Sequence, residues 1–323
     1  MPSKNTTQDF KKYTHVEHVL KIPDTYIGST EMTTENHWVY HESEGKMIKE
    51  SVTFCPGEYK IFDELLVNAL DQYVRIQQKI KSGDSDLLPV KNIKVSFNTD
   101  DNSITVYNDG EGISTELHPS EGIHIPELIF GNLLTSGNYD KKNKVTGGKN
   151  GYGGKLANIF SSHFILETVD HWNQKKYIQH FRNNMSEKDK PEITSCKNKP
   201  YTKITYYPDF AKFNQKSERL TPDILKLITK RTYDAAAITG SGVNVYLNDK
   251  KLECKSFEKY VGLFLQDAPR LYQEVNDRWA ICVAINPLQQ FDQVSFVNGI
   301  TTYQGGKHVD YILNQIVKKL QAI

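Results

Sequence analysis

The stretch Lys144-Val-Thr-Gly-Gly-Lys-Asn-Gly-Tyr-Gly-Gly-Lys155 decides the fold, because it contains five glycines together with Lys149 and Lys155. Glycine allows positive φ angles and lets a ligand approach the main chain closely. Successive N–H groups in such a loop form an anion-binding concavity. The following residues, 156–160, read as the start of a helix, whose N-terminus adds further donors. We therefore expect the loop to bind a polyphosphate.

This loop differs from two familiar nucleotide-binding motifs. No Gly-Lys-Ser/Thr closes it as in a P-loop, and the dinucleotide fingerprint is missing. A glycine-rich surface turn is the alternative, although turns seldom combine this many glycines with lysines. The stretch favours a phosphate-binding loop of another kind.

Length and composition predict a protein of about two domains without a membrane span. The chain has 323 residues, and no apolar run reaches the roughly 18 residues that a span needs. The polar N-terminus lacks the apolar core of a signal peptide, so we do not expect secretion. The four cysteines are scattered, which argues against a zinc site or a disulfide framework. A net charge of +1 does not indicate nucleic-acid binding, so any DNA contact must come from a local patch or from parts of the protein outside this chain.

Hydrophobic periodicity predicts a mixture of helices and strands without a regular βαβ repeat, which is typical of the α+β class. Helices are predicted at 61–80, 221–238 and 308–320, the second capped by Thr221 with Pro222 in its first position. Strands are predicted at 91–97, 103–107, 164–169, 201–207, 243–247, 279–285 and 293–297. Loops are predicted at 81–86 and 183–199, and residues 23–28 are predicted to form a non-helical turn.

Two further stretches place polar groups where a ligand could be bound. Glu64, Asn68, Asp71 and Arg75 are spaced by four, three and four residues, so they share one stripe of the predicted helix. The stripe could be a solvated face, yet Asn68 has apolar neighbours and is a poor helix former, which favours a specific contact. The stretch 108–112, Asn-Asp-Gly-Glu-Gly, follows a strand directly, although Asn-Asp-Gly is also a common turn.

The polar helical stripe, the stretch 108–112 and the glycine-rich loop, in their order along the chain, resemble the GHKL ATPase fold. Within that fold, the sequence closely resembles the N-terminal ATPase region of eukaryotic-type type IIA DNA topoisomerases. The resemblance extends along nearly the whole chain and includes residues 17–28, 62–75, 107–113, 133–140, 144–161, 201–213 and 295–311. It implies an α+β GHKL (Bergerat) ATPase α/β sandwich followed by the beginning of a transducer domain. The implied divisions are an N-terminal arm or dimer strap at 1–27, the ATPase domain at 28–255 and a partial transducer at 256–323.

The resemblance assigns roles to the helical stripe. Glu64 matches the general base that activates the attacking water, and a carboxylate suits this role because it can accept the proton of the water. Asn68 matches the Mg²⁺ ligand. Asp71 and Gln72 match the nucleotide-facing end of the helix, although the family usually has Asn where this chain has Gln72. Arg75 matches an arginine close to the phosphates.

Other matches concern the pocket for the adenine and the N-terminal arm. Asn108 stands where many relatives have an Asp that accepts a hydrogen bond from the adenine amino group, and an amide oxygen can accept equally well. Thr202 matches the threonine beneath the adenine pocket. Tyr26 matches an arm residue that reaches the nucleotide of the other protomer.

The phosphate loops also match the family. Ser136 and Asn138 match a loop that contacts the sugar and phosphates. Gly154 replaces a more usual Ala, which we expect to loosen the lid slightly. The cradle and lid correspond to Lys149, Asn150, Gly151, Tyr152, Gly153 and Lys155.

The resemblance implies an ATP-operated clamp that uses ATP and Mg²⁺. Homodimerisation by exchange of the N-terminal arms would capture double-stranded DNA for passage. The chain has no cleavage-core sequence, so we expect it to be part of a longer enzyme, either nuclear or viral and acting in a cytoplasmic factory. The alternatives are a nucleotide-gated dimerisation module with little turnover, or a mismatch-repair ATPase or histidine kinase. Asn108, Tyr26 and residues 295–311 argue against the last two.

Overall fold

A nine-stranded mixed sheet forms the centre of the structure, a computed structural model that describes residues 12–133, 152–276 and 278–322. The strand order is β11-β10-β3-β4-β9-β5-β6-β7, and β8 also pairs with β6. Strand β10 is parallel to β3, and the other pairs are antiparallel. The bounds are β3 Asn92–Asn98, β4 Ser103–Asp109, β5 Ser161–Asp170, β6 Lys175–Arg182, β7 Glu187–Lys188, β8 Glu192–Ser195, β9 Tyr201–Pro208, β10 Asn244–Leu247 and β11 Lys250–Lys251.

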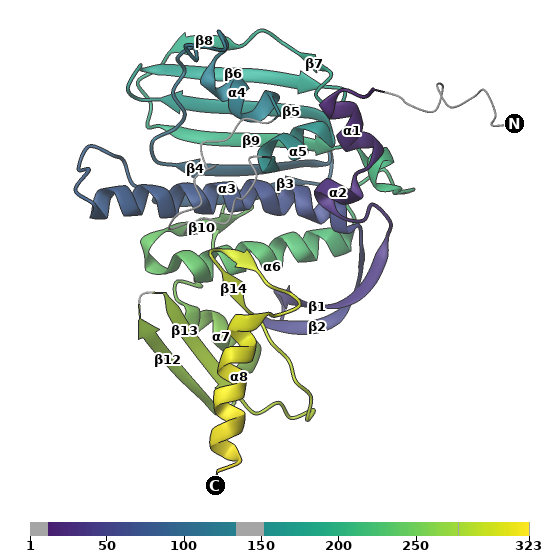
Figure 1. Ribbon diagram of the computed structural model, residues 1–323, viewed down its shortest axis with the longest axis vertical. Coiled ribbons are helices and arrows are strands. Elements are labelled where there is room, and N and C mark those ends of the chain that lie inside the picture. Colours follow the sequence, from purple (N-terminus) through teal and green to yellow (C-terminus); the bar gives the residue numbers. More distant parts are fainter. Residues whose placement is uncertain (1–11, 134–151, 277, 323) are drawn as a thin grey trace, which may run out of the picture.

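Helices cover the sheet and form a second layer with each other. Figure 1 shows α4 and α5 in front of the strands, α3 running across the molecule, and α6 beneath α3. Helix α3 packs against both α5 and α6. The bounds are α3 Pro56–Lys81, α4 Ile125–Gly131, α5 Gly153–Ile159 and α6 Pro222–Thr239, with short 3-10 turns at Phe210–Phe213 (η1) and Gly240–Gly242 (η2).

The N-terminal elements lie beside the helical layer, and the C-terminal elements lie at the lower end of the molecule in Figure 1. The N-terminal elements are α1 His15–Lys21, α2 Asp24–Ile27, β1 Thr33–His41 and β2 Lys46–Phe54, and the two strands form a hairpin. The C-terminal elements are α7 Phe257–Leu265, β12 Arg270–Asn276, β13 Trp279–Ala284, β14 Phe296–Val297, β15 Ile300–Thr301 and α8 Lys307–Leu320. No helix in these described parts of the chain is long and apolar enough to cross a membrane.

Helix α3 is held by its apolar face. Pro56 occupies its first turn, where the missing N–H costs nothing. Ile61, Phe62, Leu65 and Leu66 are almost completely buried in the core cluster. Because burying each such side chain stabilises by about 1.5–3 kcal/mol, this face fixes the rotation of α3 and turns the polar stripe toward α5.

The structure confirms the α+β class and most predicted elements. Thr221 caps α6 as predicted, with its side chain accepting from the main-chain N–H of Ile224. The turn expected at 23–28 is wrong, because Pro23 caps the single helical turn α2. The loop expected at 183–199 contains β7 and β8, which are stabilised by pairing with β6 rather than by their own sequence. Helix α5 begins at Gly153, three residues before the expected start.

The hairpin β1–β2, strand β6 and helix α7 were not predicted. The side chains of β1 do not alternate regularly between buried and exposed, so this strand lacks the strand pattern, whereas β2 does alternate from Ile48 to Phe54. The strand expected at 293–297 is limited to Phe296–Val297. Tyr260 of α7 is fully buried and its hydroxyl donates to Asp234 of α6 at 2.5 Å, so the chain after residue 255 packs directly on the helical layer.

Candidate nucleotide-binding site

The polar stripe of α3 meets the N-terminus of α5. One carboxylate oxygen of Glu64, Oε1, lies 2.6 Å from Lys60 Nζ. The other, Oε2, would be only 2.1 Å from a Cβ atom at position 153, so the carboxylate occupies the space that Gly153 leaves open. A Cβ at position 154 would lie 3.3 Å from Asn68 Nδ2. The predicted base and the predicted metal ligand are therefore adjacent to the first residues of α5.

Gly154 also has a packing role, at the contact between α5 and α4. A Cβ atom there would lie 2.6 Å from the ring of Phe130 in α4, which is itself buried. An aromatic ring in a packed core has little room to move. The glycine therefore permits close contact between α5 and α4, and the looser lid expected at this position stays a prediction.

Lys155 brings a cationic group to the same helix terminus. Its side chain is buried, and burial lowers the pKa of Lys155 to about 8. A lysine buried at the N-terminus of a short helix is suited to an anionic ligand, because a bound anion stabilises the ammonium form.

The two residues predicted to contact the adenine, Asn108 and Thr202, lie side by side on adjacent strands of the sheet. Asn108 of β4 is directly opposite Thr202 of β9, and Thr202 is directly opposite Thr168 of β5. Asn108 is 7% exposed, and its side-chain amide donates to the main-chain oxygen of Asp109 at 3.0 Å. This orientation leaves the amide oxygen of Asn108 as an acceptor. The structure thus brings Asn108 and Thr202 together, as the prediction requires.

Thr168 connects the strand row to the loop after β4, a role that the sequence did not reveal. Its hydroxyl donates to the main-chain oxygen of Tyr201 at 2.8 Å and accepts from the N–H of Ile113 at 3.0 Å. At Gly112, a Cβ atom would lie 2.1 Å from the main-chain oxygen of Val169, so the loop lies directly against β5. A threonine in a strand is too common a pattern to have indicated this role.

Asp170, at the end of β5, anchors the same loop two residues further along. Its carboxylate accepts from the main-chain N–H of Thr115 at 2.7 Å and from the amide of Asn173 at 2.7 Å. Burial acts to raise the pKa of Asp170, but these hydrogen bonds outweigh burial and lower it. The loop that follows Asn108 is therefore held against β5 at two points.

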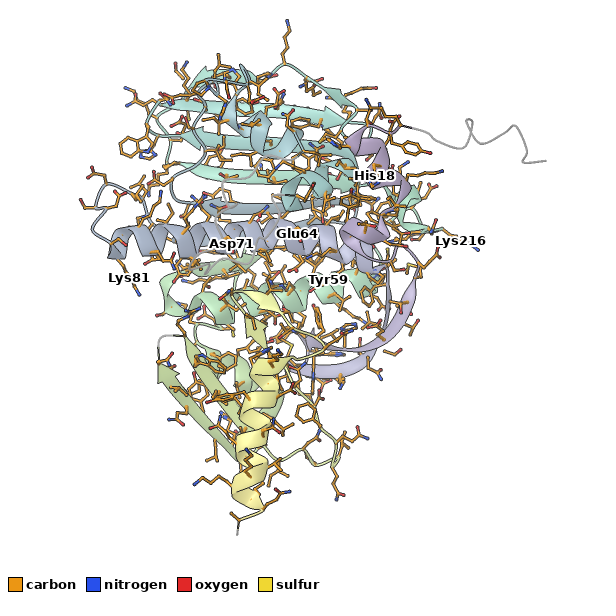
Figure 2. The ribbon with its side chains drawn as sticks, viewed as in Figure 1. His18, Tyr59, Glu64, Asp71, Lys81 and Lys216 are labelled. Carbon is orange, nitrogen blue, oxygen red and sulfur yellow. The ribbon has the colours of Figure 1, made fainter. Side chains whose placement is uncertain are left out.

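Further along α3, the side chains of Gln72 and Arg75 form a hydrogen bond with each other. The side-chain oxygen of Gln72 accepts from Arg75 Nη2, one turn away. Asp71 lies on the same helix between Glu64 and Lys81, as Figure 2 shows. The roles predicted for Asp71, Gln72 and Arg75 with a nucleotide stay predictions.

Tyr26 lies against the cradle of its own chain. Its ring packs edge-on against Tyr152 with 5.9 Å between the ring centres, and its hydroxyl lies 2.9 Å from His18 Nδ1. The contact places the arm beside the residue that precedes α5. The predicted reach of Tyr26 to a partner's nucleotide stays a prediction.

Part of the predicted cradle lies outside the described residues. This applies to Ser136, Asn138, Lys149, Asn150 and Gly151. Lys60, in contrast, is described and was missed. Its spacing of four residues from Glu64 is readable in the sequence and would have identified it.

A mixed sheet covered by α3 and α5, with Asn108 at a strand end and Glu64 at the helix contact, defines an ATPase domain of the GHKL class. The family model of DNA gyrase B matches residues 242–323. DNA topoisomerase 2 of Arabidopsis thaliana is 46% identical over 99% of this chain, which covers 21% of that protein.

Two solved structures are similar along nearly the whole chain. The ATPase region of Saccharomyces cerevisiae topoisomerase II has a TM-score of 0.89 at 46% identity, covering 98% of this chain and 81% of that one. The ATPase and transducer domains of DNA topoisomerase II from Balamuthia mandrillaris have a TM-score of 0.90 at 43% identity, covering 99% and 79%. The chain belongs to the type II DNA topoisomerase family and corresponds to its ATPase region. It spans about a fifth of the length of the curated relatives it matches.

Proposed function

We propose that this chain binds and hydrolyses ATP as the N-terminal clamp of a type II DNA topoisomerase. The observation that carries the proposal is the meeting of Glu64 and Asn68 with the N-terminus of α5, beside the buried Lys155. The polyphosphate would lie at this helix terminus, where main-chain donors and the lysine favour anions. The adenine would lie toward Asn108 and Thr202, which are neighbours on adjacent strands.

Glu64 is the proposed general base. Its Oε2 would accept a proton from water while the water oxygen bonds to the γ-phosphorus and the bond from that phosphorus to the β,γ-bridging oxygen breaks. Lys155, in its ammonium form, would stabilise the charge on the phosphates. Asn108 would orient the adenine through its amide oxygen, and Thr168 holds the loop that follows Asn108.

Mg²⁺ fits the residues that are present. No group of three or more His, Cys, Asp or Glu side chains suited to a metal occurs in the described part of the chain. The donor set is instead the Asn68 amide, and Mg²⁺ commonly takes one or two protein oxygens together with phosphates and water. We therefore propose Asn68 as its protein ligand. The ion, when bound, would neutralise charge on the phosphates.

The wider role concerns dimerisation and DNA. ATP binding would close two copies of the chain through residues 1–27 and trap a DNA duplex for double-strand passage. Residues 28–255 would form the ATPase unit and residues 256–323 the start of the transducer, with the buried Tyr260 linking the two. The relatives from Arabidopsis thaliana and Saccharomyces cerevisiae are eukaryotic, which favours action in the nucleus over a viral factory.

The decisive experiment replaces Glu64 by Gln and measures nucleotide binding and turnover separately. We expect Glu64→Gln to bind a non-hydrolysable ATP analogue normally by calorimetry and to lose turnover by about 10²-fold or more. Glu253→Gln, at an exposed position, serves as the matched control. Unchanged turnover in Glu64→Gln would refute the assigned base.

A second measurement distinguishes the alternative of a dimerisation module with little turnover. Sedimentation of the chain with Mg²⁺, with and without the analogue, reports the clamp directly. A nucleotide-dependent dimer together with turnover supports the proposal. A nucleotide-dependent dimer without turnover in the unmodified chain supports the module instead.

A further inference from the structure

The carboxylate of Glu64 is restrained on both of its oxygens. Lys60 Nζ lies 2.6 Å from Oε1, one helical turn earlier on α3. Oε2 faces the α-carbon of Gly153 so closely that a Cβ atom there would lie 2.1 Å from Oε2 and 3.0 Å from Cδ of Glu64. The two contacts come from different helices and together leave the Glu64 side chain little freedom.

The contact with Lys60 has little value as a stabilising interaction. The Lys60 side chain is 41% exposed, and a lysine four residues before a glutamate is the less favourable order of charges along a helix. The buried apolar face of α3 already holds the helix. A purely structural reason for the pair is therefore weak.

The glycine at 153 is needed for space and not for backbone conformation. Gly153 does not have a positive φ angle, unlike Gly110 or Gly112. A side chain at position 153 would meet the side chain of Glu64, both its carboxylate and its Cβ, the latter at 3.2 Å. The start of α5 and the side chain of Glu64 are thus fitted to one another.

We propose that Lys60 is a positioning residue for the hydrolysis of ATP, which it serves by holding Oε1 so that Oε2 remains the proton acceptor at the start of α5. The inference rests on the proposed function of Glu64. Lys60 keeps its own proton throughout: the proton of the attacking water passes to Oε2, the new bond forms to the γ-phosphorus, and the bridging oxygen leaves with its electron pair. Gly153 provides the space in which this carboxylate lies.

The test separates turnover from nucleotide binding in Lys60→Met. We expect kcat to fall about 10–100-fold with KM changed less than about twofold, because a displaced base costs rate rather than affinity. Lys60→Arg should restore most of kcat, since it returns a cation to Oε1. Lys226→Met is the matched control, because Lys226 is equally exposed and pairs with Glu50 and Asp223 away from the site.

The double variant Lys60→Met/Glu64→Gln tests whether the two residues act together. If Lys60 acts only through Glu64, the double variant is no slower than Glu64→Gln alone. Wild-type kcat in Lys60→Met, with Glu64→Gln inactive, overturns the role of Lys60 and leaves the proposed base intact. Wild-type turnover in Glu64→Gln, or none in the unmodified chain, overturns both.

A thermal measurement tests the steric fit without any turnover. Gly153→Ala should lower the melting temperature, because the added methyl group displaces the Glu64 carboxylate. The same substitution in a Glu64→Ala background should cost less, since only the contact with the Cβ of residue 64, at 3.2 Å, then remains. An equal loss in both backgrounds would contradict the proposed fit between Gly153 and Glu64.

Discussion

Replacing Arg231 by Met is expected to destabilise the chain strongly, because Arg231 links the nucleotide helix to the C-terminal elements. Its side chain is completely buried in α6. Nε donates to Asp63 Oδ1 on α3 at 2.6 Å, and Nη2 donates to the main-chain oxygen of Gly299 at 2.7 Å. Burial acts to lower the pKa of Arg231, but the charge of Asp63 outweighs it and raises the pKa, so Arg231 remains a cation.

The magnitude follows from the groups that lose their partner. Removing the guanidinium leaves the carboxylate of Asp63, whose side chain is 12% exposed, without its counter-charge. Breaking a buried pair in this way costs about 3–5 kcal/mol. The carbonyl of Gly299 loses a hydrogen bond from a charged donor, which adds about 1 kcal/mol or more. Burial of the Met side chain offsets part of this loss, so we expect about 4 kcal/mol in the free energy of unfolding.

Urea unfolding, followed by circular dichroism and tryptophan fluorescence, measures this loss, and coincident transitions establish that one free energy describes it. Arg231→Met/Asp63→Asn removes both charges and should be about 2 kcal/mol more stable than the sum of the single effects. Native-state hydrogen exchange should show faster opening of the turn at Gly299 in Arg231→Met. A loss below about 1 kcal/mol, or additive effects in the double variant, would refute the reasoning.

Three further predictions concern pH and packing. Because burial lowers the pKa of Lys155 to about 8, nucleotide affinity measured by calorimetry should fall as the pH rises through about 8, and Lys155→Met should remove this dependence. Burial raises the pKa of Glu58 from 4.5 to about 8, so between these pH values the folded state binds a proton that the unfolded state has lost. The free energy of unfolding should therefore fall as the pH rises over this range. Glu58→Gln should flatten the melting-temperature profile over the same range. Gly154→Ala should cost about 1–3 kcal/mol in chemical denaturation, since its Cβ would meet the Phe130 ring at 2.6 Å, and Phe130→Leu should relieve part of that cost.

Elements with strong local patterns were predictable from the sequence. The apolar spacing of 61–80 predicted α3, and the alternation in 91–97 and 103–107 predicted β3 and β4. The short strands β7 and β8 were not predictable, because β6 defines them by pairing. Strand β1 was not predictable either, because the burial of its side chains does not alternate, whereas the alternation in β2 from Ile48 to Phe54 was missed.

The candidate site shows the same division between local and long-range information. Glu64 and Asn68 could be placed on one stripe, because helical spacing is a local property. That Asn108 lies opposite Thr202 depends on the pairing of β4 with β9, across 94 residues of sequence. The hydrogen bond between Gln72 and Arg75 could be recognised only in the structure, since the two side chains could equally have extended toward a ligand.

The sequence by itself determined the family, the two long helices and the residue types of the site, because these follow from local periodicity and from motif order. The tertiary structure alone decided which groups meet. It brought the bare α-carbon of Gly153 onto the carboxylate of Glu64, and Arg231 between Asp63 and Gly299. Such contacts join residues far apart in the chain, and they arise only when the apolar faces of α3, α5 and α6 pack together, since no local pattern specifies which distant side chain will occupy a given space.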